Sequence, residues 1–173
     1  EYSDEKTLDM LEEAKDRVFV APSISLFHTM LNEGEAHGMP RVVAESMGIP
    51  ALIEESVKTH MALRKRGIRH VIGGDYGFTW NMQGTNARDI QHFIDYYGYS
   101  AAEALVCATR NGGLAMRGQG DLGTLQQGML ADMLLVDGDP LKDAAVLTDK
   151  ARLVMIMKAG VIHSLAPSLQ HKN

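Results

Sequence analysis

One short stretch, residues 68–78, constrains the fold of this chain more than any other. The apolar pair Val71 and Ile72 predicts a short buried strand, and Gly73-Gly74 and then Asp75 follow it. Two glycines at the carboxyl end of a strand allow a tight turn and the close approach of another group. Because α/β folds keep their chemistry at the carboxyl ends of strands, we expect Asp75 to stand at a functional edge of a parallel sheet.

Composition and charge narrow the class of protein. The chain has 173 residues, 45% of them hydrophobic and 23% charged, which suits one globular domain with a small appendage. A net charge of −5 argues against nucleic acid or an anionic membrane as the main partner. No apolar run approaches the roughly 18 residues of a membrane helix. The single cysteine, Cys107, excludes an internal disulfide framework and is typical of a reducing compartment, so we expect a cytoplasmic protein.

Helix and strand signals alternate before residue 68. Residues 4–14 have apolar side chains at helical spacing and an acidic first turn, and residues 18–24 form an apolar strand signal that a proline ends. Since Glu1 stands almost inside the first helix, we expect the sequence to be part of a longer polypeptide or to be trimmed.

The next segments complete a βαβ pattern. Residues 25–50 carry mixed signals, and their glycines and prolines favour an active-site loop with at most a short helix. Residues 53–66 have apolar side chains near helical spacing and cations at their end, and Gly67 closes this helix. Strand, loop, helix and strand therefore predict one parallel βαβ unit.

The chain after Asp75 predicts a polar loop and two helices. Residues 76–86 are rich in aromatic and amide side chains, and Asn86 is placed to cap a helix that ends at Gly98. Ser100 with Glu103 predicts a capping box for a second helix, which continues to residue 113.

The final third changes to short β signals. Apolar runs around Leu125, Leu135 and Met155 are bounded by turn signals and predict one small sheet, whereas residues 164–173 indicate a loose tail. The acidic pair in residues 137–140 could suggest a metal site, but Asp-Gly-Asp-Pro between strands is foremost a turn sequence.

Three segments of this final third together carry a resemblance to a known family. Residues 108–113 (ATRNGG), 122–141 (LGTLQQGMLADMLLVDGDPL) and 154–160 (VMIMKAG) resemble the carboxyl-terminal signature of the amidohydrolase superfamily. The likeness is greatest to the branch of imidazolonepropionase-like and prolidase-like metal-dependent hydrolases. Residues 18–23 are similar to the seventh barrel strand of this family, and residues 71–75 are similar to its eighth.

The resemblance implies an α/β fold of two parts. Residues 1–115 would form the last part of a (β/α)8 barrel, with strands seven and eight and their helices. Residues 116–173 would form strands of a small β-sandwich and a tail. The histidines and the lysine that bind metal on earlier strands of the family would all precede Glu1, so the resemblance implies the carboxyl-terminal part of a longer enzyme.

The resemblance also implies a chemistry. The family hydrolyses amide, cyclic amide or related C–N bonds with a divalent metal, for which zinc is the expected ion. Asp75 matches the aspartate that binds this metal and accepts a proton from the attacking water, a role that suits a carboxylate because a metal lowers the pKa of bound water toward 7. Without the resemblance, a lone aspartate after two glycines is more typical of a turn. The alternative function is a catalytically empty fold remnant that serves as a structural or partner-binding module.

Candidate substrate contacts lie on the two loops that follow the barrel strands. His28 follows strand seven, and Tyr76, Phe78 and Trp80 follow strand eight, although an aromatic side chain in such a loop packs on its own scaffold about as often. His37 lies on the same loop as His28. We expect structural or surface positions for the remaining histidines and a core position for the cysteine, that is, for His60, His70, His92, His163, His171 and Cys107.

The expected partner is a small-molecule substrate. The strands near Val20 and Ile72 are apolar on both faces, and such strands are normally covered on both sides and paired at their edges. We therefore expect the chain to form a homo-oligomer or to contact the rest of the enzyme, and to bind zinc poorly when isolated.

Overall fold

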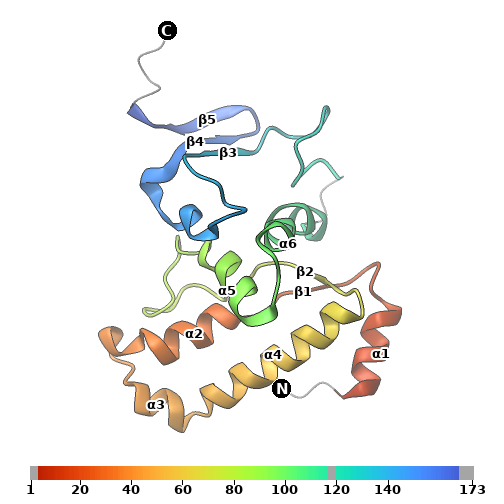
Figure 1. The fold of residues 1–173 in the computed structure, drawn as a ribbon, viewed down its shortest axis with the longest axis vertical. Helices are drawn as coiled ribbons and strands as arrows, with labels where there is room; N and C mark the ends of the chain where they lie inside the picture. The colour runs from red at the N-terminus through yellow and green to blue at the C-terminus, as the bar shows by residue number, and fades with distance from the viewer. Residues whose placement is uncertain (1–3, 117–119, 168–173) are drawn as a thin grey trace.

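The computed structural model describes residues 4–116 and 120–167, which form a mixed α/β structure (Figure 1). The helices are α1 (Glu5–Glu13), α2 (Ile24–Asn32), α3 (Arg41–Ser46), α4 (Ile49–Lys65), α5 (Arg88–Tyr97), α6 (Ala101–Val106) and α7 (Gly112–Ala115). The strands are β1 (Phe19–Val20), β2 (Arg69–His70), β3 (Met133–Val136), β4 (Leu153–Lys158) and β5 (Val161–Leu165). Shorter helical segments are η1 (Gly34–His37), the π-helical η2 (Cys107–Asn111), η3 (Ala144–Thr148) and η4 (Lys150–Arg152).

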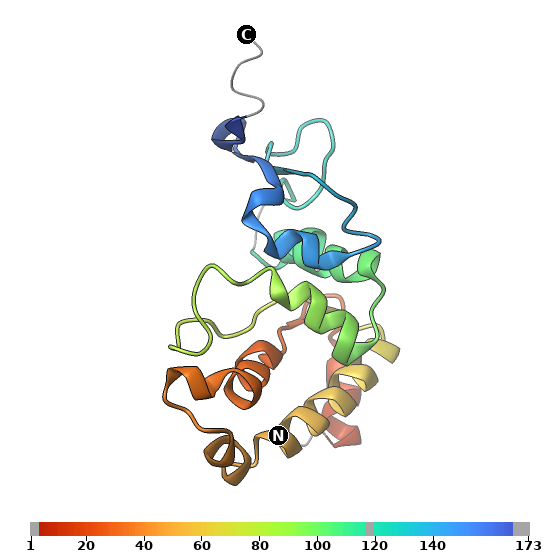
Figure 2. The ribbon, with the colours of Figure 1, turned by 60° about the vertical axis from the view of Figure 1, so that its left-hand side comes forward.

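The main core lies where α2, α4, α5 and α6 pack together. Ile24, Phe93, Tyr97 and Ala104 are fully buried there, and the rings of Phe93 and Tyr97 meet edge to face at 5.5 Å. Figure 2 shows α5 between the helices α2 and α4 on one side and the carboxyl-terminal sheet on the other. Burial of these apolar and aromatic side chains is the main stabilising term for the helical part. None of the helices within residues 4–116 and 120–167 is long and apolar enough to cross a membrane.

Strands β1 and β2 run parallel. Phe19 lies opposite Arg69 and Val20 lies opposite His70, and the N–H of Val71 donates to Val20 O at 3.0 Å. The predicted parallel βαβ unit is confirmed, although the paired residues of the second strand lie slightly earlier than the pattern indicated. Parallel strands end at the same edge, so the segments that follow β1 and β2 emerge side by side.

The segment between β1 and α4 is more helical than expected. We predicted a loop over residues 25–50, and this part of the chain instead holds α2, η1 and α3. Gly38 and Gly48 have left-handed φ angles of 81° and 78° at points where one helical segment ends and the next begins. A residue without Cβ tolerates positive φ and so ends a helix cleanly, which means that these glycines connect helices.

The helices after β2 follow their sequence signals in part. Glu103 N donates to Ser100 Oγ at 3.3 Å and Ser100 N donates to the Glu103 carboxylate at 2.8 Å, so the predicted capping box is confirmed. Asn86 does not cap α5, which follows Ala87 without a side-chain cap. The Asn86 side chain accepts the N–H of Gly84 at 3.1 Å inside the loop, a turn role that asparagine also favours.

The carboxyl-terminal strands form one antiparallel sheet in the order β3-β4-β5. Leu135 pairs with Met155, which confirms that the segments around these residues are neighbouring strands. The prediction for Leu125 is wrong, because this residue lies outside the strands and is 75% exposed. The third strand is β5, and its Ser164 pairs with Ile156, so the predicted loose tail begins too early. The sequence Asp-Gly-Asp-Pro forms the turn that follows β3, as predicted.

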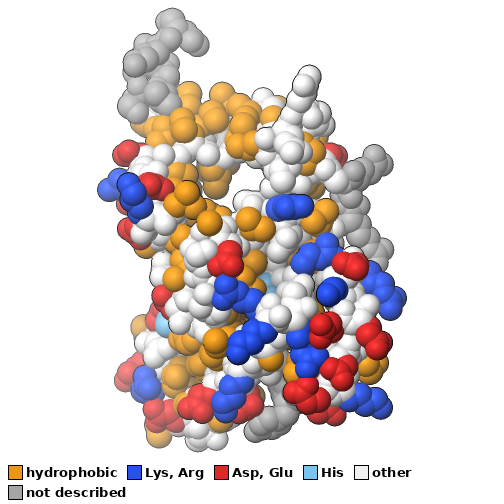
Figure 3. Space-filling model, turned by 45° about the vertical axis from the view of Figure 1, so that its right-hand side comes forward, with side chains coloured by type: hydrophobic (Ala, Val, Ile, Leu, Met, Phe, Trp, Pro, Cys, Tyr) orange, Lys and Arg blue, Asp and Glu red, His pale blue; other side chains and the backbone are white. Residues whose placement is uncertain are grey.

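This sheet leaves apolar side chains on the surface. Leu134, Leu135, Val161 and Ile162 are each at least 48% exposed. Figure 3 shows hydrophobic side chains gathered at the end of the molecule where the sheet lies, whereas charged side chains cover the helical end. A contiguous exposed apolar patch is typical of a surface that another part of a protein covers.

Candidate active site

Asp75 lies just beyond the carboxyl end of β2 and its side chain is exposed. Its φ angle is 53°, a left-handed conformation that residues with a Cβ rarely adopt. Gly74 before it is buried and has no room for a side chain. A Cβ there would lie 2.6 Å from Tyr76 Cε2, 2.7 Å from Asp89 Oδ1 and 2.7 Å from Ser25 Cβ. The glycine is therefore required by close approach of three neighbours, as the strand-glycine-glycine pattern indicated.

A buried polar network binds the backbone on both sides of the Asp75 Cα. Asn81, which is 1% exposed, donates from Nδ2 to Gly74 O at 2.8 Å and to Asp75 O at 3.0 Å. Ser25 Oγ donates to Asn81 Oδ1 at 3.3 Å, so the network also includes the first turn of α2. The loop after β2 is thus tied to the helix after β1, which is possible because the two parallel strands end at one edge.

Tyr76 belongs to the same network. Its hydroxyl lies 2.9 Å from Asp89 Oδ1 and 3.2 Å from Ser25 Oγ. Burial raises the pKa of Asp89 to about 6, and the hydrogen bonds from Tyr76 and Ser25 limit that rise. Burial also raises the pKa of the Tyr76 hydroxyl, so this group remains a hydrogen-bond donor at neutral pH. Tyr76 therefore joins the loop to α5 and α2 through its hydroxyl.

Phe78 and Trp80 stack on each other. Their ring centroids lie 5.5 Å apart with an interplanar angle of 18°, and a short bridge between Phe78 and Asn81 closes the loop. Phe78 is 42% exposed, whereas Trp80 is half-buried and packs against the main core. Of the two rings, Phe78 is the one more open to solvent.

His28 lies on α2 and faces α5. Its Nδ1 lies 2.7 Å from the Tyr96 hydroxyl, and its ring centroid lies 4.5 Å from that of His92. His28 Nε2 lies 3.8 Å from the Glu33 carboxylate, which also pairs with Arg88. Burial lowers the pKa of His28. Among the described residues, the hydrogen-bond, ion-pair and ring partners of His28 lie on α2, on α5 or at Glu33, which ends α2, so the structure does not join His28 to Asp75.

The remaining histidines were expected at structural or surface positions. His92 takes a structural one, since it is 5% exposed and its ring lies against that of His28 on α2. His70 is buried, in contact with His60, and Cys107 is buried as predicted. His163 is exposed on β5. His171 lies outside the described residues.

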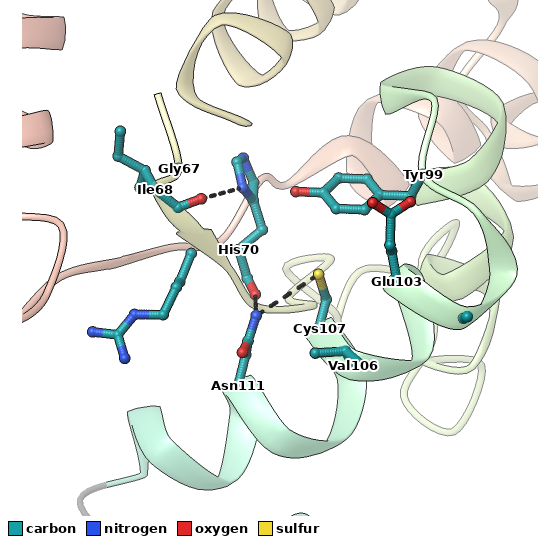
Figure 4. Close-up of a pocket in the computed structure, with 10 residues that line it drawn as sticks. Gly67, Ile68, His70, Tyr99, Glu103, Val106, Cys107 and Asn111 are labelled. Carbon is teal, nitrogen blue, oxygen red and sulfur yellow. Dashed lines mark hydrogen bonds between the residues drawn. The ribbon is translucent and has the colours of Figure 1, made fainter. Parts of the chain in front are cut away.

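A cavity of about 350 Å³ lies beside β2 and the Gly67-Ile68 segment that leads into it (Figure 4). It is lined mostly by apolar atoms of residues 67–70, which include β2, and of α6 and η2. Asn111 Nδ2 donates to His70 O at 2.9 Å at its edge, and Cys107 and Tyr99 form part of its wall. Because parallel α/β folds act at the carboxyl ends of their strands, this cavity is separate from the candidate active site.

The metal expected at Asp75 needs ligands beyond those described. In the part of the chain that the structure covers, no group of three or more His, Cys, Asp or Glu side chains is arranged to hold a metal ion. An exposed carboxylate has the chemistry of one zinc ligand, and zinc sites require at least three from protein. Asp75 thus fits as a contributor to a metal centre, whereas the described residues do not build one alone.

Comparison with known proteins decides the family. The Amidohydrolase family model matches residues 2–162. The chain belongs to the amidohydrolase family. Among curated proteins it is similar to ochratoxinase of Aspergillus niger, with 26% identity over 161 residues that make up 92% of this chain and 32% of that protein. The chain therefore spans about a third of the length of the curated relatives it matches.

Solved structures of this family share the fold of the chain. The crystal structure of A. niger ochratoxinase superposes with a TM-score of 0.77 and 22% identity over 95% of this chain and 35% of that one. A putative prolidase from Bifidobacterium longum gives 0.79 and 21%, over 93% and 40%. A Xaa-Pro dipeptidase with bound methionine in the active site gives 0.73 and 21%, over 93% and 37%. The mixed α/β part and the terminal three-stranded sheet thus align with about a third of amidohydrolase structures.

The sequence signals led to Asp75 but not to the groups beneath it. Asn81, Ser25 and Asp89 were not among the candidates, because each looks like an ordinary loop or helix-end residue. The one available signal was the density of amide side chains in residues 76–86, since an asparagine in such a loop often binds backbone carbonyls.

Proposed function

We propose that the chain supplies the end of the catalytic barrel of a metal-dependent hydrolase of amide, cyclic amide or related C–N bonds. The observation that carries the proposal is the exposed carboxylate of Asp75 beyond the carboxyl end of β2, on a loop where the Asn81 side chain binds the carbonyls of Gly74 and Asp75. In this proposal β1 and β2 are strands seven and eight of a (β/α)8 barrel, and the sheet β3-β4-β5 is part of a small β-sandwich. The other strands come from residues outside these 173.

The chemistry assigned to Asp75 follows from its exposure and charge. When bound, a divalent metal such as zinc would supply Lewis acidity and lower the pKa of a water molecule. Asp75 would give one oxygen ligand and would accept the proton of that water, since a carboxylate near a reacting group can act as general base. Membership of the family and the prolidase and ochratoxinase relatives support an amide substrate.

The neighbouring rings suit a substrate with an apolar portion. Phe78 presents an exposed ring from the same loop as Asp75 and is backed by Trp80. We assign Phe78 to substrate contact, with Trp80 as its support. Tyr76 and His28, both engaged with α5, are assigned to the scaffold that holds the loop and α2.

A second function stands beside this one. The described residues hold no group of three metal-binding side chains, which favours a catalytically empty module that binds a partner if no further ligands exist in the protein. In that case the exposed apolar side chains of β3 and β5 would be the binding surface.

Replacement of Asp75 separates the two functions. In the complete enzyme, Asp75→Asn keeps the shape of the side chain but removes its negative charge and its ability to accept a proton, so we expect kcat to fall by about 10²-fold or more. Asp137→Asn, in the exposed turn after β3, is the matched control and should keep normal turnover. Unfolding curves should coincide for all three proteins. Near-normal turnover of Asp75→Asn with metal bound would remove Asp75 from the mechanism.

A further inference from the structure

We propose that Asn81 is a positioning residue that fixes the backbone angles of Asp75. The inference rests on the proposed function, because it concerns the residue assigned to proton transfer. The inference goes beyond the proposed function because it assigns a role to a buried side chain. That side chain does not contact the substrate and holds the Asp75 carboxylate in place.

The geometry that carries the inference is a single amide that binds two successive carbonyls. Asn81 Nδ2 donates to Gly74 O at 2.8 Å and to Asp75 O at 3.0 Å. Gly74 O belongs to the peptide plane before the Asp75 Cα, and Asp75 O belongs to the plane after it. One side chain therefore fixes both peptide planes that define φ and ψ of Asp75.

The conformation that Asn81 holds is one that Asp75 would not keep unaided. A φ of 53° in a residue with a Cβ costs about 1–2 kcal/mol relative to ordinary backbone. Such a residue keeps this conformation only when its surroundings determine it. Turning Asp75 back to negative φ would swing its carboxylate away from the edge where β2 ends.

Asn81 is itself held on all sides. Its N–H donates to Phe78 O at 3.0 Å, and its carbonyl accepts the N–H of Gly77 at 2.9 Å. Its Oδ1 accepts the hydroxyl of Ser25 at 3.3 Å, which also orients the amide so that Nδ2 faces the two carbonyls. A buried and fully bonded amide of this kind has one available orientation, so it can impose that orientation on Asp75.

The first test compares variants in the complete enzyme. Asn81→Asp keeps the size of the side chain but loses both N–H donors, and Asn81→Ala loses the group entirely. A displaced catalytic group lowers kcat steeply, so we expect kcat to fall by about 10- to 100-fold for each, with KM changed less than about twofold. Gln83→Ala is the matched control. Gln83 is exposed and donates from the same loop to Tyr76 O at 3.1 Å, whereas the carbonyls on either side of the Asp75 Cα are bound by Asn81, so the loss of Gln83 should leave kcat unchanged.

A second readout separates positioning from general destabilisation. Amide hydrogen exchange at Gly77 and Asn81, whose N–H groups close this loop, should be faster in Asn81→Ala while the exchange of α4 stays as in the wild type. Thr29→Val removes another buried hydroxyl, one that bonds only within α2, and should alter neither the loop exchange nor kcat. If both Asn81 variants fail to fold, Ser25→Ala decides the matter, since it keeps the amide but removes its orienting bond and should lower kcat by about 2- to 5-fold.

The outcomes distinguish this inference from the proposed function. Wild-type kcat in a folded Asn81→Asp or Asn81→Ala enzyme, or in Ser25→Ala where those do not fold, would overturn the positioning role while leaving Asp75 essential. Normal activity of Asp75→Asn would overturn the proposed function, and loop exchange in Asn81→Ala would still report whether Asn81 holds the backbone of Asp75.

Discussion

His60 Nδ1 lies 3.0 Å from His70 Nε2, and this bond joins α4 to β2 in the interior. His70 Nδ1 lies 3.2 Å from Ile68 O, which can only accept, so His70 carries its proton on Nδ1 and accepts at Nε2. His60 must then donate from Nδ1. The pair is a chain of two neutral rings with fixed tautomers, and a proton added to His70 Nε2 would remove its acceptor.

This pair predicts a loss of stability in mild acid. Burial lowers the pKa of both rings to about 4, against an ordinary value of about 6.5 in the unfolded chain. Between these values the unfolded chain binds more protons than the folded one, so the free energy of unfolding falls as the pH is lowered from 6.5 to 4. These two shifts correspond to a loss of about 3 kcal/mol for each ring by pH 4. His92 acts in the same direction, and Asp89, whose pKa is raised to about 6, acts in the opposite one.

Urea denaturation at pH 7, 5.5 and 4.5 measures this dependence. His60→Gln should be less stable at pH 7 and should lose less on acidification than the wild type. His163→Gln, at an exposed position on β5, should lose as much free energy of unfolding on acidification as the wild type. If His60→Gln also loses as much as the wild type, the pair does not titrate on unfolding.

Gly74→Ala should destabilise the protein by about 1–3 kcal/mol, the range of overpacked cores. The added methyl would meet Tyr76, Asp89 and Ser25 within 2.7 Å. Gly73→Ala is the adjacent control, because its methyl would meet only Ala21 Cβ, at 3.1 Å, and should cost less. Thermal unfolding of both variants measures the difference. Equal midpoints would show that the loop moves freely enough to accept a side chain at position 74.

Arg64→Lys should destabilise the contact between α4 and α6 by about 1–2 kcal/mol. The Arg64 guanidinium donates to Gly98 O at 2.7 Å and to both oxygens of Glu103 at 2.9 and 3.0 Å, and it lies 4.2 Å from the centroid of Tyr99. A lysine keeps the charge but not this planar set of donors. Lys65→Ala, one position along the same helix, is the control and should change unfolding by less than about 0.5 kcal/mol. Equal effects of the two substitutions would contradict the role of the guanidinium.

The 173-residue chain prepared by itself should associate and bind zinc weakly. Exposed apolar side chains on β3 and β5 and the short two-stranded pair β1-β2 leave surfaces that favour contact with another chain. Light scattering and metal analysis of the purified chain test both points. A monodisperse monomer that holds stoichiometric zinc tightly would contradict them.

Local signals made much of the fold predictable. The strand before Gly73-Gly74, the helix that Gly67 closes and the capping box of Ser100 each depend on residues close in sequence, and each is present. The place of Asp75 in the fold was predictable to the same extent, because it follows from the strand and the glycines next to it.

The errors arise where distant segments decide the structure. Gly38 and Gly48 resemble loop signals in sequence, and only the packing of α2 and α3 on α4 shows that they separate helices. Asn81 was missed because its partner Ser25 is 56 positions away, beyond the reach of any local pattern.

The β1-β2 ladder spans only two residues on each strand, and its register has a consequence for any preparation of the enzyme. A shift of this ladder by one residue would displace Ser25 relative to Asn81 by about 3.3 Å and break their bond. Such misregistered molecules would retain most of their helices but lack a fixed Asp75. Specific activity per mole of protein would then report the fraction of molecules with the native register. Circular dichroism would instead report the helix content of all molecules, whatever their register.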